Sequence, residues 1–237
     1  GSRMGATGRT MQTAERWLKQ SLNYEFTDAD LFRQALTHRS APGNSNERLE
    51  FLGDAILDFV ISEAIYLARP RASEGDLSRL RAHLVSDASL AELALELELG
   101  EHLLLGSGEK KSGGHRRESI LADALEAIFG AVFLDRGFDA GRMLILACFE
   151  ERLAALPNAE DLRDPKTRLQ EWLQGRGMSL PSYELERISG QAHRQTFEVR
   201  CSLADSDLNA SGSGSSRRGA EQQAARRLFD ALQKAAS

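Results

Sequence analysis

Acidic residues with helical spacing are the part of this sequence most able to do chemistry. Four acids follow one another at intervals of three or four residues within NERLEFLGDAILDFV (46–60), namely Glu47, Glu50, Asp54 and Asp58. At about 100° per residue, these intervals place the four carboxylates in one narrow stripe of a helix. The opposite stripe is apolar and consists of Leu49, Leu52, Ile56, Phe59 and Val60.

A solvated helix face would give the same pattern, so the helical angles leave two interpretations open. The acidic stripe has no Lys or Arg four residues further along that would relieve the repulsion, as solvated helices commonly do. Several like charges this close together are unfavourable unless a cation neutralises them. We therefore favour a cluster of functional carboxylates over a solvated face.

A second apolar stretch, ESILADALEAIFGAVFLD (118–135), repeats this arrangement. Asp123 and Glu126 are three residues apart and share a helix face. Gly130 lies on the same face, and we expect it to leave the backbone bare beneath the acids. Two such helices could bring four or more carboxylates together. Oxygen ligands without His or Cys select Mg²⁺ or Mn²⁺, and such a site suits phosphodiester hydrolysis.

The composition is that of an ordinary globular protein. Of the 237 residues, 41% are hydrophobic and 27% are charged. No apolar run approaches the roughly 18 residues that span a bilayer, and no signal-peptide pattern opens the chain. We therefore expect a cytoplasmic protein without a membrane partner. Cys148 and Cys201 have no ligand spacing for zinc and are interpreted as small buried hydrophobic residues.

The elements that must position the acids are helices. Periodicity predicts helices over 13–21, 28–37, 46–68, 75–84, 87–97, 117–135 and 139–154. The glycine-rich run at 106–114 is expected to interrupt them. Because no strand-like alternation occurs in the first 155 residues, we predict an all-α domain over 13–155.

The pattern changes after a polar segment, 156–163, which is predicted to be a linker. KTRLQEWLQGRG is an amphipathic helix, and SYELERISG and QTFEVRCSL alternate as paired strands do. A third short strand is expected near 205–211, and a long helix closes the chain. The order α-β-β-β-α predicts a small α+β domain over 164–235.

Charge is unevenly distributed between these two domains. The net charge is −5, yet basic residues are in slight excess after residue 160. Polar and basic residues there could contact nucleic acid: Thr167 and Gln170 on one helix face, His193 in the hairpin loop, and Arg217 and Arg218 opening the last helix. Stacking aromatics are missing, which favours recognition of the shape of an A-form duplex.

Together these segments resemble the ribonuclease III family. NERLEFLGDAIL resembles the signature segment of that family, ALTHRSA and EGDLSRLRAHLVS its flanking segments, and RRESILADALEAIFGAVFLD its second acidic motif. DPKTRLQEWLQGRG, GQAHRQTF and SSRRGAEQ are similar to a double-stranded-RNA-binding domain. The likeness runs from about residue 13 to residue 234.

The resemblance implies a Mg²⁺-dependent endoribonuclease that acts on double-stranded RNA as a homodimer, with Mn²⁺ able to substitute. It implies that the products carry 5′-phosphate and 3′-hydroxyl ends with two-nucleotide 3′ overhangs. It also implies processing of ribosomal and other structured RNA precursors, and it points to no particular protein partner besides a second copy of the chain. The family's metal ligands fall on Glu50, Asp54, Asp123 and Glu126. Its further catalytic acids fall on Glu47 and Glu74, and its RNA contacts on the five residues named above.

Some residues keep open interpretations. Asp58 lies on the acidic stripe but outside the family's motif, so we expect a surface acid or a neighbour of the site. His38 is interpreted as a hydrogen-bonded structural histidine. The loop EKKSGGHRR (109–117) is either a flexible surface loop or a second RNA contact, which we favour, through Lys110, Lys111, Arg116 and Arg117.

Two other functions are weighed against the endoribonuclease. A non-catalytic binder of duplex RNA could keep the fold for dimerisation, but it would have no reason to hold four carboxylates together against their repulsion. A metal-dependent phosphohydrolase of small nucleotides is disfavoured because the attached basic domain fits a long duplex.

Overall fold

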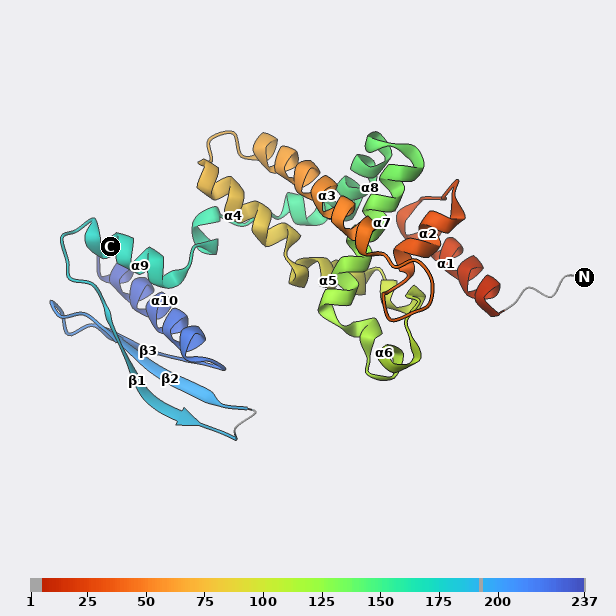
Figure 1. Ribbon diagram of the computed structural model, residues 1–237. Helices are drawn as coiled ribbons and strands as arrows, with labels where there is room; N and C mark the ends of the chain where they lie inside the picture. Colours follow the sequence, from red (N-terminus) through yellow and green to blue (C-terminus); the bar gives the residue numbers. More distant parts are fainter. Residues whose placement is uncertain (1–5, 192–193, 237) are drawn as a thin grey trace, which may run out of the picture. The chain divides into compact units, whose positions relative to one another are not determined.

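The computed structural model describes residues 6–191 and 194–236 and divides into two compact units between Ala159 and Glu160 (Figure 1). In the described part of unit 1, the elements are helices, with one isolated bridge between Thr37 and Leu104. In unit 2, the residues that the structure describes form a three-stranded sheet and two α-helices. The predicted fold class, an all-α domain followed by an α-β-β-β-α domain, is confirmed. Within the ranges described we find no helix with the length and apolar character of a membrane span.

The helices of unit 1 lie close to the predicted ranges: α1 (Ala6–Leu22), α2 (Ala29–Leu36), α3 (Glu47–Ala68), α4 (Glu74–Val85), α5 (Asp87–Glu96), α7 (Glu118–Arg136) and α8 (Phe138–Ala154). The first helix begins earlier than predicted. The glycine-rich run contains a short helix, α6 (Ser107–Lys111), between two 3₁₀ turns, η1 (Leu99–His102) and η2 (Gly114–Arg116). Serine side chains cap α4 and α5, since Ser73 and Ser86 accept backbone N–H groups of their first turns.

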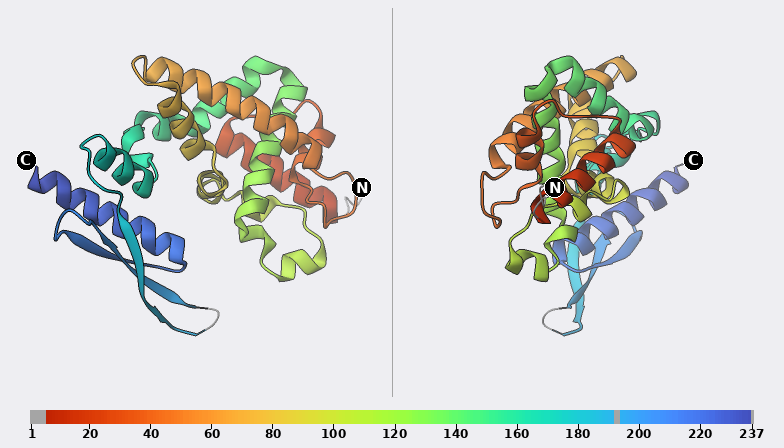
Figure 2. Two further views of the ribbon diagram at one scale, coloured as in Figure 1. Left: turned by 60° about the vertical axis from the view of Figure 1, so that its left-hand side comes forward. Right: turned by 90° about the vertical axis from the view of Figure 1, so that its right-hand side faces the viewer.

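Helix α7 is the centre of unit 1. Its residues from Ile120 to Val132 are buried, apart from the two half-buried acids Asp123 and Glu126. Helices α2, α3, α5 and α8 all pack against it, as the further views in Figure 2 show. A helix that is apolar on nearly all sides must be enclosed in this way. Any carboxylate on α7 therefore lies at the edge of the core.

One expectation for α3 was wrong. Leu49, Ile56 and Val60 are buried as predicted, but Phe59 is 58% exposed. The reason is that α7 covers only part of the predicted apolar stripe. Phe59 lies beyond that cover and meets the ring of Phe138 edge to face, with centroids 5.6 Å apart.

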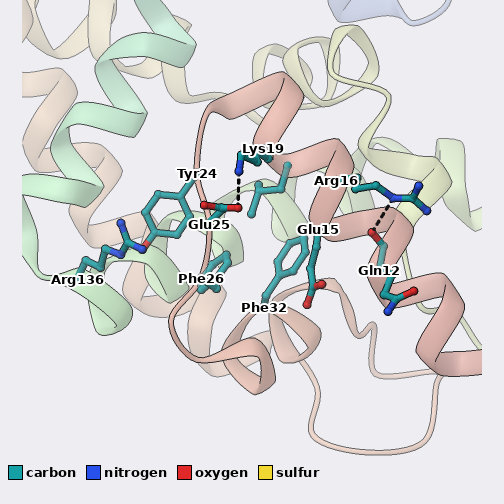
Figure 3. A pocket seen from close by; sticks show the side chains of 10 residues that line it. Gln12, Glu15, Arg16, Lys19, Tyr24, Glu25, Phe26, Phe32 and Arg136 are labelled. Carbon is teal, nitrogen blue, oxygen red and sulfur yellow. Dashed lines mark hydrogen bonds and ion pairs between the residues drawn. The ribbon is translucent and has the colours of Figure 1, made fainter. Parts of the chain in front are cut away.

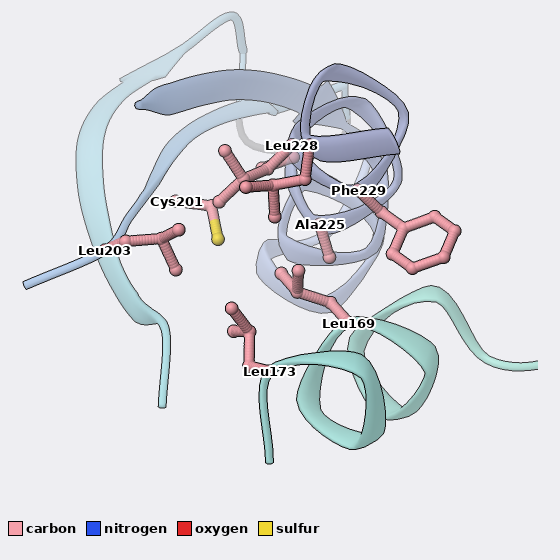
Figure 4. Packing of buried hydrophobic residues seen from close by; sticks show 9 residues of the cluster. Leu169, Leu173, Cys201, Leu203, Ala225, Leu228 and Phe229 are labelled. Atoms are coloured by element: carbon pink, nitrogen blue, oxygen red, sulfur yellow. The ribbon is translucent and has the colours of Figure 1, made fainter. Parts of the chain in front are cut away.

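A short 3₁₀ turn, η3 (Ala159–Leu162), spans the boundary between the units and falls inside the segment predicted as a linker. The elements that follow are α9 (Pro165–Gln174), β1 (Ser182–Ser189), β2 (Thr196–Ser202), β3 (Asn209–Gly214) and α10 (Arg217–Ala235). The strands are antiparallel in the order β1-β2-β3. Their inner residues and the two helices share one core, formed by Leu169, Leu173, Cys201, Leu203, Ala225, Leu228 and Phe229 among others (Figure 4).

The third strand lies later than predicted, at Asn209–Gly214 instead of 205–211. Its glycines suggested a loop, but they are needed by the packing. A Cβ on Gly212 would lie 2.3 Å from the backbone N of Ala224, so α10 lies directly on the strand backbone. The preceding residues form a loop in which the Asp205 carboxylate accepts the Ser179 N–H at 2.9 Å.

Candidate active site and nucleic-acid interface

Two glycines allow α3 and α7 to cross with their backbones in contact. A Cβ on Gly53 would lie 1.8 Å from the carbonyl oxygen of Glu126. A Cβ on Gly130 would lie 2.3 Å from the carbonyl oxygen of Leu49. The expectation that Gly130 leaves bare backbone beneath the acids was wrong, because it is buried in the crossing itself. The backbones that carry the side chains of Glu50 and Glu126 are therefore in contact at the crossing.

Three carboxylates converge at this crossing. One oxygen each from Glu50, Asp123 and Glu126 lies within 4.8 Å of the others, and all three side chains are half-buried. The ligands are carboxylate oxygens, without His or Cys. Such a donor set fits a hard divalent cation.

The electrostatics of the three residues agree with a cation site. Burial, followed by the charges of Asp54, Glu50 and Asp123, raises the pKa of Glu126 to about 8. Burial and then Asp123 raise the pKa of Glu50. Burial and then Asp87 raise the pKa of Asp123, although His38 opposes this. Each carboxylate is therefore destabilised in its charged form by burial and by neighbouring acids, and a bound cation would reverse that penalty.

Asp54 and Asp58 lie at the margin of the group. The Asp54 side chain is exposed and is not among the three converging carboxylates, although its charge raises the pKa of Glu126. Asp58 is half-buried, and burial followed by Asp54 raises its pKa while Arg81 lowers it. Asp58 thus belongs to the acidic stripe but is not among the three converging carboxylates.

Glu47 lies in a pocket with two of the three converging acids. This pocket has a volume of about 540 Å³ and is lined by Glu47, Glu50 and Asp123 together with basic residues. The Glu47 carboxylate lies 3.8 Å from the guanidinium of Arg39 and accepts the hydroxyl of Ser45 at 3.0 Å. Glu47 is therefore partly neutralised by the protein itself.

Glu74 is not brought to this group within the single chain. It opens α4, where it accepts the hydroxyl of Ser78 at 2.8 Å. It lines a separate pocket of about 420 Å³ with Phe59 and Tyr66. The family resemblance therefore grouped Glu74 with acids that the fold of one chain places elsewhere.

Two acids near the site were missed by sequence reasoning. Asp87 contributes to the raised pKa of each converging carboxylate, and Glu109 lines the pocket and pairs with Arg117 at 2.7 Å. In the sequence, Asp87 is an ordinary acid of a helix start and Glu109 belongs to a glycine-rich loop. Neither shows a periodic signal, because their positions depend on how α5 and this loop pack against α7.

His38 lines the same pocket and helps to hold one of its loops in place. Its Nδ1 lies 2.8 Å from the Ser40 hydroxyl, which also accepts the Gly106 N–H at 2.9 Å. These bonds join the loop after α2 to the start of the glycine-rich loop. They agree with the structural role predicted for His38.

A larger pocket lies away from the acids, along α1 and the segment that follows it (Figure 3). Its volume is about 690 Å³, and its lining includes Tyr24, Phe26 and Arg136. Lys19 pairs there with Glu25 at 2.7 Å, and the Tyr24 hydroxyl donates to Asp135 at 2.7 Å. None of the converging carboxylates lines this pocket.

In unit 2, the proposed RNA contacts that the structure describes are all exposed. Thr167 and Gln170 lie on α9, and Arg217 and Arg218 begin α10. The Ser216 hydroxyl caps α10 by accepting the Gly219 N–H at 3.1 Å. The positive end of the α10 dipole therefore coincides with the two arginines, as suits a phosphate. His193 lies outside the described residues.

Comparison with known proteins gives matches over both units. A family model described as Ribonuclease-III-like matches residues 28–153, and a model of the double-stranded RNA binding motif matches residues 165–232. Ribonuclease 3 of Alkalilimnicola ehrlichii is 54% identical over 94% of this chain and 98% of its own. Ribonuclease 3 of Methylococcus capsulatus is 57% identical over 91% of this chain and 94% of its own.

Solved structures match unit 1. The nuclease domain of ribonuclease III from Campylobacter jejuni is 46% identical, with a TM-score of 0.56, over 58% of this chain and 94% of that one. A second structure of that domain, described by the flexibility of a region involved in dimer formation, is 47% identical with a TM-score of 0.56. It covers 57% of this chain and 95% of that one.

Proposed function

The chain belongs to the ribonuclease III family as a ribonuclease III-type endoribonuclease acting on double-stranded RNA, and from this premise we propose that its phosphodiester hydrolysis depends on Mg²⁺. Mn²⁺ is proposed to substitute. The observation that carries the proposal is the convergence of Glu50, Asp123 and Glu126 at the glycine crossing. All-oxygen ligands favour these two ions over Zn²⁺.

We assign the ligand roles to four carboxylates. Glu50, Asp123 and Glu126 would hold the ion, and Asp54, whose charge raises the pKa of Glu126, would be the fourth ligand. When bound, the ion activates water and stabilises the leaving oxygen. The chain itself fixes the ligands through the α3–α7 crossing.

Glu47 and Glu74 are assigned supporting roles. Glu47 orients groups in the pocket through its contacts with Arg39 and Ser45. Glu74 lies beside exposed aromatic residues of α3, so its role is proposed within the dimer.

The apolar surface of α3 supports a homodimer. Phe51 is 79% exposed, and Tyr66 and Leu67 are each 67% exposed. Exposed hydrophobic residues gathered on one helix mark an interaction surface. Two copies would supply two sites, one for each strand, and leave 5′-phosphate and 3′-hydroxyl ends with two-nucleotide 3′ overhangs.

Unit 2 is proposed to hold the duplex through Thr167, Gln170, His193, Arg217 and Arg218. The exposed cations Lys110, Lys111 and Arg116 of unit 1 are proposed to meet RNA phosphates near the acids. The nuclease domain is assigned to 13–155, the linker to 156–163 and the RNA-binding domain to 164–235. The substrates are proposed to be ribosomal and other structured RNA precursors in the cytoplasm.

A cleavage assay tests these assignments. Duplex and single-stranded RNA of the same sequence are incubated with the protein, with and without Mg²⁺, and the product ends are mapped. We expect cutting of the duplex alone, only with the ion, and with two-nucleotide 3′ overhangs. Equal cutting after removal of divalent ions would refute the metal assignment, and blunt ends would refute the two-site arrangement.

A further inference from the structure

Two acidic residues lie inside the surface that unit 2 is proposed to present to RNA. Asp164 caps α9, and Glu221 lies one turn into α10. A carboxylate beside a phosphate-binding arginine ordinarily opposes binding by repulsion. The contacts of these two acids indicate a different effect.

The two oxygens of Glu221 have different partners. Oε2 lies 2.6 Å from Nζ of Lys166, at the start of α9. Oε1 lies 3.0 Å from Nε of Arg217, at the start of α10. The Glu221 side chain is only 14% exposed, and the Lys166 ammonium also lies 4.4 Å from the centroid of the Tyr183 ring. One carboxylate thus joins the two helices and holds a proposed RNA contact.

Asp164 divides its oxygens in the same way. Oδ1 accepts the backbone N–H of Thr167 at 3.0 Å and the Thr167 hydroxyl at 3.2 Å. Oδ2 accepts the side-chain amide of Gln222 on α10. The carbonyl oxygen of the Gln222 side chain accepts the backbone N–H of Lys166 at 3.1 Å. A second acid therefore also joins the helices and holds a proposed contact.

We infer that these four residues form a clasp, the α9–α10 clasp, composed of Asp164, Lys166, Glu221 and Gln222. The phosphates of an A-form duplex have fixed spacing, so both helix starts must be presented to it at a matching separation. The clasp sets that separation and orients Thr167 and Arg217. Glu221 is therefore a positioning residue that strengthens RNA binding in spite of its charge. This inference rests on the proposed RNA contacts of unit 2.

The charge states agree with the clasp. The hydrogen bond from Lys166, with that from Arg217, lowers the pKa of Glu221. Burial tends to raise the pKa of Asp164, but the hydrogen bonds from Thr167 and Gln222 lower it overall. Both acids are therefore fully ionised at neutral pH, as the ion pair and the cap require.

The test compares two variants that remove one negative charge from the same helix. Glu221→Gln keeps the size of the side chain but weakens the clasp. Asp230→Asn is the matched control, because Asp230 is exposed on α10 and lies outside the clasp. Affinity of the full chain for a duplex of about 25 base pairs is measured over a range of salt concentrations. Divalent ions are omitted so that the RNA is not cut.

We expect Glu221→Gln to weaken binding about fivefold and to reduce the salt slope by about 0.9, the loss of one phosphate contact. Asp230→Asn should bind as wild type or slightly more tightly. A purely structural effect would lower the melting temperature and the active fraction but leave the salt slope unchanged. Binding by Glu221→Gln that equals or exceeds wild type, as for the control, would overturn the inference.

Two further variants separate the possible failures. Gln222→Ala changes no charge, so a loss of affinity by about twofold to threefold follows only from lost geometry. Should Glu221→Gln not fold, unchanged affinity of Gln222→Ala overturns the clasp. Arg217→Ala tests the proposed contact itself. If Arg217→Ala weakens binding and Glu221→Gln does not, the clasp fails alone. If Arg217→Ala binds RNA as the wild type does, the proposed contact is wrong, and the inferred effect of the clasp on RNA binding is wrong with it.

Discussion

Glu126 on α7 and Glu221 on α10 are both partly buried glutamates on helices, but their pKa values move in opposite directions. Burial and then Asp54, Glu50 and Asp123 raise the pKa of Glu126 to about 8. The hydrogen bond from Lys166 is the main cause that lowers the pKa of Glu221. The first glutamate is surrounded by acids and the second by its own cations.

The opposite pKa shifts of Glu126 and Glu221 indicate whether the protein itself supplies a cation to each carboxylate. A group of carboxylates that destabilise one another gains most from a cation supplied from outside. A carboxylate already paired with Lys and Arg needs none, and can serve to hold those cations in place. Unit 1 is therefore suited to bind a metal ion and unit 2 to bind phosphates. Four predictions test this comparison.

The largest expected effect is on Glu126. We predict that Glu126→Gln lowers the cleavage rate about 10³-fold or more, because the variant lacks a proposed ligand of the ion that would stabilise the charge of the transition state. Binding of duplex RNA without divalent ions should be unchanged. Single-turnover cleavage and a binding titration measure the two effects. Glu150→Gln, the same exchange at an exposed position of α8, is the control. Efficient cleavage by Glu126→Gln in Mg²⁺ would remove Glu126 from its role.

The second effect is on the crossing that creates the acidic group. Gly53→Ala places a Cβ 1.8 Å from the Glu126 carbonyl oxygen, so α3 and α7 must separate. We predict a loss of about 3 kcal/mol in the stability of unit 1, and loss of cleavage. Chemical unfolding and a cleavage assay measure both. Gly108→Ala is the control, since its Cβ would meet no atom within 4 Å. A fully active, stable Gly53→Ala protein would contradict the backbone contact.

The third effect is the response of the metal-free protein to pH. The raised pKa of Glu126 means that its protonated form favours the folded state. This contribution is full below about pH 4.5 and is lost as pH rises through about 8. We predict that the melting temperature falls by about 2–4 °C over that range, relative to Glu126→Gln. Mg²⁺ should restore it at high pH. Thermal unfolding with and without the ion measures this. A difference in melting temperature between the wild type and Glu126→Gln that does not change with pH would argue against repulsion among the carboxylates.

The smallest effect concerns unit 2 and has the opposite sign. The lowered pKa values of Glu221 and Asp164 stabilise the folded state above the usual carboxyl pKa of about 4, and this is lost as pH falls through the folded values. We predict that Glu221→Gln reduces the acid sensitivity of unit 2 by less than about 1 kcal/mol. Amide signals of unit 2, followed by NMR during acid titration, measure this. Greater acid sensitivity in the variant would contradict the assignment.

Much of the fold could be predicted because its signals are local. The helices of unit 1 follow from apolar periodicity, and the ends of several of them are fixed by caps such as Ser73 and Ser86. The strand β3 was misplaced because its glycines suggest a loop when read alone. Only the approach of Ala224 on α10 explains why Gly212 belongs to a strand.

The acidic residues show the same limit. Spacing along one helix correctly indicated that Glu50 and Asp54 share a stripe, and that Asp123 and Glu126 share another. Spacing could not indicate that Asp54 is exposed while Glu50 converges with the acids of α7. Spacing along one helix could not indicate Asp87 either, because this residue belongs to a third helix, α5.

By itself, the sequence determined the helices, the two acidic stripes and the change from an all-α to an α+β unit, since each depends on residues close together in the chain. The tertiary structure decided which acids meet and which face solvent. That choice depends on the depth at which two helices cross, and the depth is set by Gly53 and Gly130, which lie far apart in the chain. The clasp in unit 2 was likewise decided by the fold, because its four residues come together only when α9 and α10 pack on the same core.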